Sequence, residues 1–201
     1  KKDGSFDDEG FSKVYDAWWA DKRARRDIDI DRENVQSFVR ASTGAMLESG
    51  NGGNFVYSPL NVYMALSMLA ECTDGDSRTQ ILSLLRENSL EDVRAQAKAL
   101  WNANYCADGA VTSVLASSVW LDEGVGYVQK TLDTLAQSYY ASSFSGKMGS
   151  DSYNKALQSW LNEQTGGLLK DQASGLEFTP ETVMALATTI YYRAKWSQEF
   201  S

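Results

Sequence analysis

The sequence contains no histidine, and this absence is its most restrictive feature. Histidine is the usual general base for a serine or cysteine nucleophile and the commonest zinc ligand. A Ser-His-Asp triad, a Cys-His dyad and a His-based zinc protease site are therefore impossible within these 201 residues. The two cysteines, Cys72 and Cys106, are too far apart for a CxxC motif, so we expect no metal or other cofactor. Whether they form a disulfide is left open by the sequence.

The sequence also has fewer basic than acidic residues and lacks long hydrophobic runs. The chain has 19 Lys and Arg against 27 Asp and Glu, which gives a formal charge of -8. Nucleic acid is a poor candidate partner, because affinity for it comes largely from basic side chains that neutralise phosphates. No run is long enough to span a membrane, and the start shows no signal peptide. Because Lys1 is not a methionine, we expect a processed or engineered product.

We predict that residues 1–31 form a flexible or weakly ordered N-terminal segment. Residues 32–201 are predicted to be the N-terminal part of a single domain. Residues 1–10 are acidic and weakly patterned. Trp18 and Trp19 then stand beside the basic cluster Lys22 to Arg26. Such a stretch can bind nucleic acid or an anionic surface, but aspartates flank it on both sides. We therefore favour a short helix docked by its aromatic side chains.

Local rules assign clear roles to most of the stretch from residue 54 to 70. Phe55-Val56-Tyr57 predicts a strand, and the apolar run from Val62 to Ala70 predicts a buried helix. Ser58 suits the N-cap of that helix, with Pro59 at the first helical position, where its missing N–H is harmless. Ser58 is thus predicted to cap, and no nucleophile is assigned. Asn61 is unexplained, since it is polar and enters a buried helix.

Periodicity and capping signals predict the remaining elements. The expected helices are 32–48, one that begins at a Ser77–Gln80 capping box, 89–105 with Ser89 as its cap, 128–140, and one from 151 to about 166. The expected strands are 112–121, a short one at Phe144, and an apolar run over 181–196. This last run suits a central strand covered on both faces. Because the chain ends at Ser201 without a partner for one of its edges, we expect these residues to begin a larger domain or to pair with another chain.

Four motifs, in a family's order and spacing, show that the sequence resembles a serpin. Between about Arg32 and Phe200 they are Tyr57-Ser58-Pro59-Leu60-Asn61, Gly75-Asp76-Ser77-Arg78-Thr79-Gln80, Trp160 with Thr165, Gly167 and Lys170-Asp171, and Thr188-Thr189-Ile190-Tyr191-Tyr192-Arg193-Ala194-Lys195-Trp196. The resemblance implies an α+β fold with N-terminal helices packed around a large mixed or antiparallel central sheet. It also implies that strands 112–121 and 181–192 are neighbours and that the helix from Asp151 crosses the sheet. The fold is incomplete without its C-terminal part.

The function that the resemblance implies is suicide inhibition of serine, and sometimes cysteine, proteases. In serpins the protease attacks a reactive loop and is trapped as an acyl-enzyme when the loop inserts into the large sheet. That loop lies near the family's C-terminus, outside these residues, so no reactive bond can be named. The implied partners are a covalently bound target protease and the C-terminal remainder of the serpin, as the same or a separate chain. The family habit also favours an extracellular location.

Four residues match positions that serve sheet opening in the family. Ser58, Asn61 and Thr188 match a polar cluster beneath the centre of the sheet, and Trp196 matches a tryptophan near the point of loop entry. The family usually has serine at the Asn61 position and asparagine at the Thr188 position, so amide and hydroxyl have exchanged places here. Because unpartnered buried polar groups cost about 1–3 kcal/mol, we expect Asn61 and Thr188 to bond each other directly or through a water. For Trp196, simple core packing is the alternative.

Other functions stay open at this point. A non-inhibitory serpin-fold carrier, storage or chaperone protein would differ in the missing loop, where bulky or charged residues block insertion. A carboxylate-based enzyme such as a glycosidase has only the abundance of Asp and Glu in its favour, and these form no convergent pair. Some serpins bind polyanions through a basic helix at the 89–105 position. Here Arg94 and Lys98 face Glu91 and Asp92, so we predict a solvated face without strong heparin-like activation.

Overall fold

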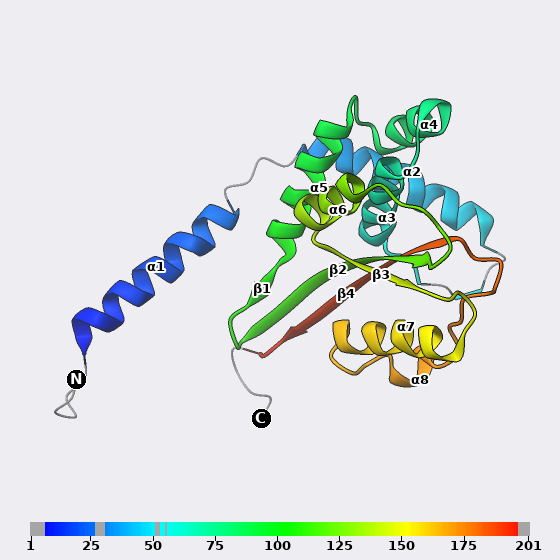
Figure 1. Cartoon of the computed structure of the whole chain (residues 1–201). Helices are drawn as coiled ribbons and strands as arrows, with labels where there is room; N and C mark the ends of the chain where they lie inside the picture. Colours follow the sequence, from blue (N-terminus) through cyan, green and yellow to red (C-terminus); the bar gives the residue numbers. More distant parts are fainter. Residues whose placement is uncertain (1–6, 27–30, 51–52, 55, 197–201) are drawn as a thin grey trace.

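The computed structural model describes residues 7–26, 31–50, 53–54 and 56–196. It places helices on both sides of a twisted sheet (Figure 1). The helices are α1 (Asp8–Arg26), α2 (Arg32–Ser49), α3 (Pro59–Glu71), α4 (Gly75–Leu85), α5 (Leu90–Asn104), α6 (Gln129–Tyr139), α7 (Asp151–Gln164) and α8 (Lys170–Ala173). The strands are β1 (Cys106–Ala107), β2 (Val111–Asp122), β3 (Ala141–Gly146) and β4 (Met184–Ala194).

Strand β2 is the centre of the sheet in the described part of the chain. On one edge it pairs antiparallel with β1 and parallel with β3, and on the other it pairs antiparallel with β4. The parallel β2–β3 pair is connected through α6, as a parallel crossover requires. The predicted pairing of the two long strands is therefore confirmed. Strand β4 begins three residues later than expected, because a turn with a hydrogen bond from Thr182 N to Thr179 O precedes it.

Alternating side chains of β2 supply the two hydrophobic cores, one on each face of the sheet. Leu115 and Val119 point toward α3, where Tyr63, Met64 and Met68 complete the first core with residues of α2, α5 and α6. Ala116 and Trp120 point to the opposite face and pack under α7. Figure 1 shows α7 and α8 alone on that side, with α2 to α6 gathered on the other. The prediction that the helix from Asp151 crosses the sheet is confirmed.

Trp120 is the anchor of the layer between the sheet and α7. Its ring stacks on Phe144 with centroids 4.1 Å apart and meets Tyr153 edge-on at 5.3 Å. Its indole N–H donates to Ser118 Oγ at 2.8 Å, so burial leaves no polar atom of the ring unpartnered. Trp160 of α7 also contacts Trp120, at 6.4 Å between ring centroids. These contacts hold α7 against the centre of β2.

Three predicted details of local structure are wrong. The helix expected to begin at Ser77 begins at Gly75, because Asp74 is its N-cap and accepts a hydrogen bond from Gly75 N at 2.8 Å. Val56 and Tyr57 form no strand, since a strand needs a pairing partner and they pair with none of the described residues; Phe55 lies outside these. Strand β4 is covered on both faces only in its first half, and Ile190 and Tyr192 further along are exposed.

The N-terminal stretch forms a longer helix than predicted. Helix α1 contains 19 residues, and it contacts α5. Tyr15 and Trp18 are exposed instead of docked, at 48% and 40% of full exposure, whereas Trp19 is half-buried. Residues 1–6 and 27–30 of the expected lead-in, and the end of the motif match at Phe200, lie outside the described residues. Cys72 and Cys106 are free thiols. None of the described helices combines the length and apolar character needed to cross a membrane.

Candidate functional site

The start of α3 meets strand β4 in a small polar cluster under the sheet, here called the α3–β4 cluster (Ser58, Asn61, Ser117 and Thr188). Ser58 is the N-cap of α3, as predicted, and its Oγ accepts a hydrogen bond from Asn61 N at 3.4 Å. Pro59 follows at the first helical position. The cap sets where the helix starts, and so it determines where Asn61 meets the sheet.

Asn61 and Thr188 are in direct contact, but not through both side chains. Thr188 Oγ1 donates a hydrogen bond to the backbone carbonyl oxygen of Asn61 at 3.2 Å. The Asn61 side-chain oxygen is buried and has no hydrogen-bond partner among the described residues. The expected hydrogen bond between the two residues therefore exists. Its acceptor is the main-chain carbonyl of Asn61, whereas we expected the side-chain amide of Asn61. The first turn of α3 leaves this carbonyl accessible to β4.

Ser117 is a member of the cluster that sequence reasoning missed. It stands directly opposite Thr188 in the β2–β4 register and is only 2% exposed. Ser117 is two residues from both Leu115 and Val119 in β2. Because side chains alternate along a strand, it lies on the same face as these two, the face that packs on α3. Its hydroxyl also lacks a partner in the described part of the chain. No pattern in the sequence distinguishes this serine, because the strand also contains Ser113 and Ser118.

Trp196 lies just beyond the end of β4 and is 76% exposed. It is not a member of either hydrophobic core described above. The edge of β4 that faces away from β2 pairs with no other strand among residues 7–26, 31–50, 53–54 and 56–196. A row of backbone N–H and C=O groups along this edge can therefore accept another strand. The α3–β4 cluster lies beneath the middle of the same strand.

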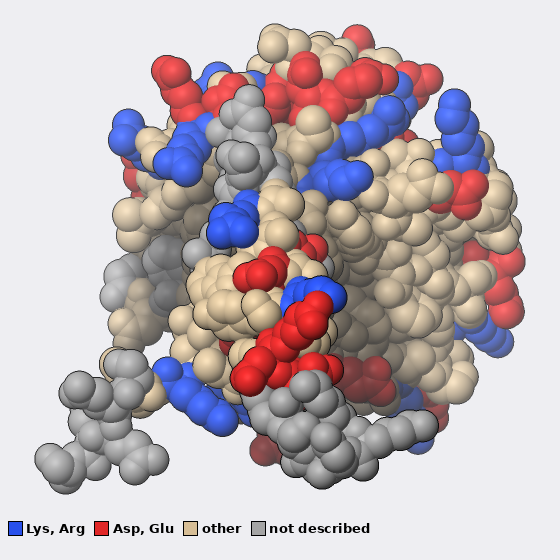
Figure 2. Space-filling model, turned by 90° about the vertical axis from the view of Figure 1, so that its left-hand side faces the viewer, with Lys and Arg blue, Asp and Glu red and all other residues tan. Residues whose placement is uncertain are grey.

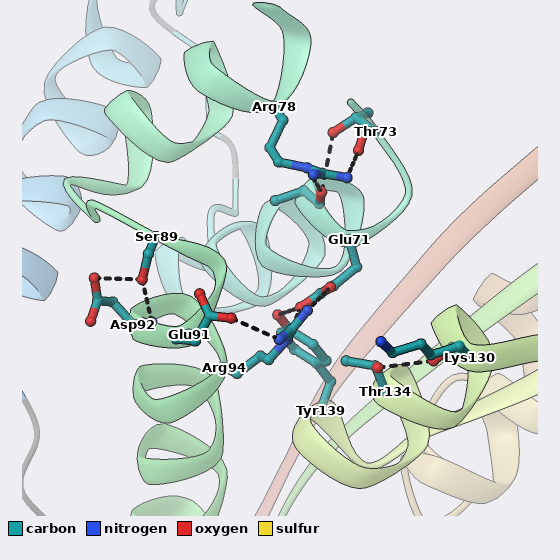
Figure 3. Close-up of polar contacts among 11 residues, drawn as sticks. Glu71, Thr73, Arg78, Ser89, Glu91, Asp92, Arg94, Lys130, Thr134 and Tyr139 are labelled. Carbon is teal, nitrogen blue, oxygen red and sulfur yellow. Dashed lines mark hydrogen bonds and ion pairs between the residues drawn. The ribbon is translucent and has the colours of Figure 1, made fainter. Parts of the chain in front are cut away.

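A second polar cluster sits at the opposite end of α3 and joins three helices (Figure 3). The Glu71 carboxylate accepts hydrogen bonds from Arg94 Nε at 2.7 Å and Arg94 Nη2 at 2.8 Å. The Tyr139 hydroxyl donates to Glu71 Oε1 at 2.8 Å. Arg94 comes from α5 and Tyr139 from α6, and the Glu71 side chain is only 4% exposed. This charged contact was not predicted, since the sequence does not show which residues the fold brings together.

Burial and the neighbouring carboxylate determine the protonation states in this second cluster. Burial, together with the negative charge of Glu71, raises the pKa of Tyr139 well above its ordinary range. The hydrogen bonds that the Arg94 guanidinium donates to Glu71 raise the pKa of Arg94. Partial burial of the thiol and the negative charge of Glu71 raise the pKa of the adjacent Cys72, which lowers its share of thiolate. The cluster is therefore built for stable charge pairing, and no nucleophile is activated there.

The face of α5 is less basic than its composition suggests. Arg94 is engaged by Glu71 and also lies 3.5 Å from Glu91 Oε1, while Lys98 is exposed one turn further along. An anion that binds Arg94 must compete with two carboxylates. The described residues also contain no group of three or more His, Cys, Asp or Glu side chains that could hold a metal ion.

The architecture defines a class: helices packed around a mixed sheet, with an open strand edge above a buried polar cluster. The serpin (serine protease inhibitor) family model matches residues 33–201, and the chain belongs to this family. It is 26% identical to alpha-1-antitrypsin of Meriones unguiculatus over 176 residues, which cover 85% of this chain and 43% of that protein. The chain thus spans less than half the length of this curated relative.

Solved structures show the same fold. The latent state of tengpin, a thermophilic serpin, matches with a TM-score of 0.74 at 22% identity, over 86% of this chain and 47% of that one. Human thyroxine-binding globulin, solved with its hormone, matches with a TM-score of 0.72 at 18% identity, over 84% and 46%. At these identities the likeness defines the fold alone. The two structures match the chain about equally well.

Proposed function

We propose that the intact protein is a serpin-type suicide inhibitor of serine proteases, and in some cases of cysteine proteases. The protease nucleophile attacks a reactive loop that lies outside these residues and forms an acyl-enzyme. The cleaved loop then inserts as a new strand into the large sheet and traps the enzyme. This chain contributes the sheet that receives the loop, and no catalytic residue of its own.

The observation that supports this proposal best is the outer edge of β4. It pairs with no strand in the described part of the chain and runs beside a polar cluster with two unpartnered oxygens, Asn61 Oδ1 and Ser117 Oγ. An edge of this kind favours strand addition, because its backbone groups need partners. A segment that enters here, from the inserted loop or from the C-terminal remainder, would lie beside Thr188, whose hydroxyl contacts Asn61.

In this proposal Ser58, Asn61 and Thr188 control how easily the sheet opens. The single hydrogen bond from Thr188 to the Asn61 carbonyl ties β4 to α3 and must break or shift when β4 moves. One neutral hydrogen bond contributes about 1 kcal/mol, which is small enough to be exchanged during insertion. Trp196 contacts the entering loop near the end of β4. A Trp196→Phe protein with unchanged insertion rate and stoichiometry of inhibition would assign this residue to packing alone.

A second candidate is a non-inhibitory carrier, storage or chaperone protein. The fold is compatible with this function, because thyroxine-binding globulin shares it. The two candidates differ in what a protease does to the intact protein. An inhibitor forms a covalent complex, whereas a carrier is cleaved and releases the protease active.

The decisive experiment mixes the intact protein with a panel of serine and cysteine proteases and looks for a complex that survives SDS. The matched control is the same protease with its nucleophile substituted, which should give no such complex. Cleavage without a complex, for every protease tested, would favour the carrier. The cleaved bond would also locate the reactive loop.

We also propose an extracellular location, in line with the habit of secreted serpins. Heparin is expected to accelerate inhibition little, because Arg94 is already paired with Glu71 and Glu91. A large acceleration that disappears with rising ionic strength would contradict this.

A further inference from the structure

Helix α1 presents an aromatic face that the proposed inhibitory function does not use. Figure 1 shows most of the helix extending away from the sheet, and the helix contacts α5. Phe11, Val14, Tyr15 and Trp18 are exposed by 58%, 71%, 48% and 40%. Their spacing of three, four and seven residues places them on one side of the helix. Exposed apolar faces of this kind mark interaction sites in folded proteins.

The rings on this face already contact one another. Phe11 and Tyr15 stack with centroids 6.0 Å apart, and Tyr15 and Trp18 stack at 6.1 Å. Contacts within the helix lower the entropy that a partner must remove, since ordered aromatic side chains have few rotamers left to lose. Tyrosine and tryptophan are also the residues that contribute most to interface energies. The face is thus preorganised for association.

The charges of α1 are divided between its two ends. The helix begins after Asp7 with Asp8 and Glu9, and its last five residues, 22–26, read Lys-Arg-Ala-Arg-Arg. Figure 2 looks onto this helix, with acidic groups gathered toward its lower, N-terminal end. The acidic N-terminal end of one such helix is therefore complementary in charge to the basic C-terminal end of a second helix that runs antiparallel to it.

We propose that α1 is a self-association element that pairs antiparallel with α1 of a second copy of this chain. A pair centred near Tyr15 brings Phe11 of one helix level with Trp18 and Trp19 of the other. The same arrangement sets Asp7 and Asp8 of each helix near the exposed Arg23 of its partner. Antiparallel helix dipoles add a favourable term, and a parallel pair would instead place like charges together.

An anionic surface fits α1 less well than a second copy does. Binding to anionic lipid or nucleic acid needs basic groups along the whole polar side of a helix. Here Asp16 and Asp21 interrupt that side, and Lys13 is paired with Glu9 at 2.7 Å. A net attraction to an anionic surface would be confined to the last turn and a half. Charge complementarity therefore favours self-pairing.

The expected association is weak and reversible. Specific interfaces usually bury more than about 1,000 Å², and a single pair of helices is near or below that limit. We expect sedimentation equilibrium of the intact protein to show a concentration-dependent dimer over the micromolar range. Raising the salt concentration should weaken it, because exposed charge pairs are screened. Association driven by apolar contacts alone would strengthen with salt and would count against the antiparallel pairing.

Two single charge reversals test the orientation. Asp8→Lys and Arg23→Glu should each weaken self-association by about tenfold, since each turns attraction into repulsion at both ends of the dimer. An equimolar mixture of the two variants should recover the wild-type affinity. Recovery also shows that neither change unfolds α1. The matched control Lys155→Glu alters an exposed residue of α7 by the same charge and should leave the dimer unchanged.

The aromatic face is tested by Val14→Ser with Tyr15→Ser, which should abolish the dimer while the thermal unfolding of the body stays the same. The proposal is overturned if the intact wild-type protein is monomeric throughout the micromolar range. It is equally overturned if the mixture of charge variants stays as weak as each variant alone. Binding of wild-type monomer to vesicles of anionic phospholipid, with loss in the double serine variant, would assign the face to a membrane surface instead.

Discussion

The Glu71 cluster makes the sharpest stability prediction. Replacing Glu71 by Ala removes the carboxylate on which α3, α5 and α6 converge. The Tyr139 hydroxyl, in a fully buried residue, is left without its acceptor. The Arg94 guanidinium loses both of its short contacts with Glu71. It keeps only the longer approach to Glu91 at 3.5 Å.

The magnitude follows from burial. A buried hydroxyl without its partner costs about 1–3 kcal/mol. The Arg94 side chain is 32% exposed, so water partly replaces its lost partner. The loss of the Arg94–Glu71 pair therefore costs about 1 kcal/mol, which is less than the full penalty of a buried ion. We therefore expect Glu71→Ala to lower the free energy of unfolding by about 3 kcal/mol. Glu71→Gln should cost about 1–2 kcal/mol, because the amide oxygen can still accept from Tyr139.

Urea unfolding of the intact protein measures these differences, followed by tryptophan fluorescence and circular dichroism. A double-mutant cycle of Glu71→Ala with Arg94→Ala isolates the coupling between the two residues. The matched control is Glu91→Ala, whose side chain is 79% exposed and whose loss should change stability by less than about 0.5 kcal/mol. If Glu71→Ala behaves like Glu91→Ala, or if the coupling energy is near zero, the reasoning from burial is wrong.

Two further predictions compare neighbouring residues, and a third concerns the pH dependence of stability. Ser117→Ala should raise the free energy of unfolding by about 1 kcal/mol, because its buried hydroxyl has no partner in the described part of the chain, whereas Ser118→Ala, which removes two hydrogen bonds, should lower it. A destabilising Ser117→Ala would mean that a residue outside these segments bonds the hydroxyl. Gly166→Ala should cost more than Gly167→Ala: both have positive φ, but only at Gly166 would a Cβ meet a tyrosine ring of β4, at 2.7 Å. Equal costs would contradict the contact between the end of α7 and β4. The raised pKa of Tyr139 predicts that its contribution to stability is complete below about pH 10 and falls as the pH rises further, because the unfolded chain loses this proton first. Urea midpoints measured between about pH 8 and about pH 11 should show this fall, and Tyr139→Phe should make it shallower.

The sequence predicted helix starts correctly where one side chain accepts a hydrogen bond from one nearby backbone N–H group. Ser58 and Ser89 cap their helices as predicted, because a cap is a bond between residues three apart. The start of α4 was predicted wrongly, since two capping residues compete there and Asp74 lies nearer the turn. The strand expected at residues 55–57 failed for a different reason. Strand formation depends on a partner, and β-propensity cannot show whether one is present.

The α3–β4 cluster was predicted in part. The resemblance brought Asn61 and Thr188 together, and they are in contact. The choice of acceptor could not be predicted, because it depends on how the first turn of α3 lies against β4. Ser117 was overlooked because a serine in a strand has no distinctive pattern, and only the register with Thr188 shows its place.

By itself, the sequence determined the family, the order of the longer helices and strands, and the absence of any histidine-based chemistry within these residues. These follow from composition, short-range spacing and motifs, which need no knowledge of distant contacts. The tertiary structure decided which polar atoms find partners. It showed that α3 connects two polar clusters, with Asn61 against β4 at one end and Glu71 against Arg94 and Tyr139 at the other. Residues far apart in the chain meet only through packing, and burial then determines the energy of each contact.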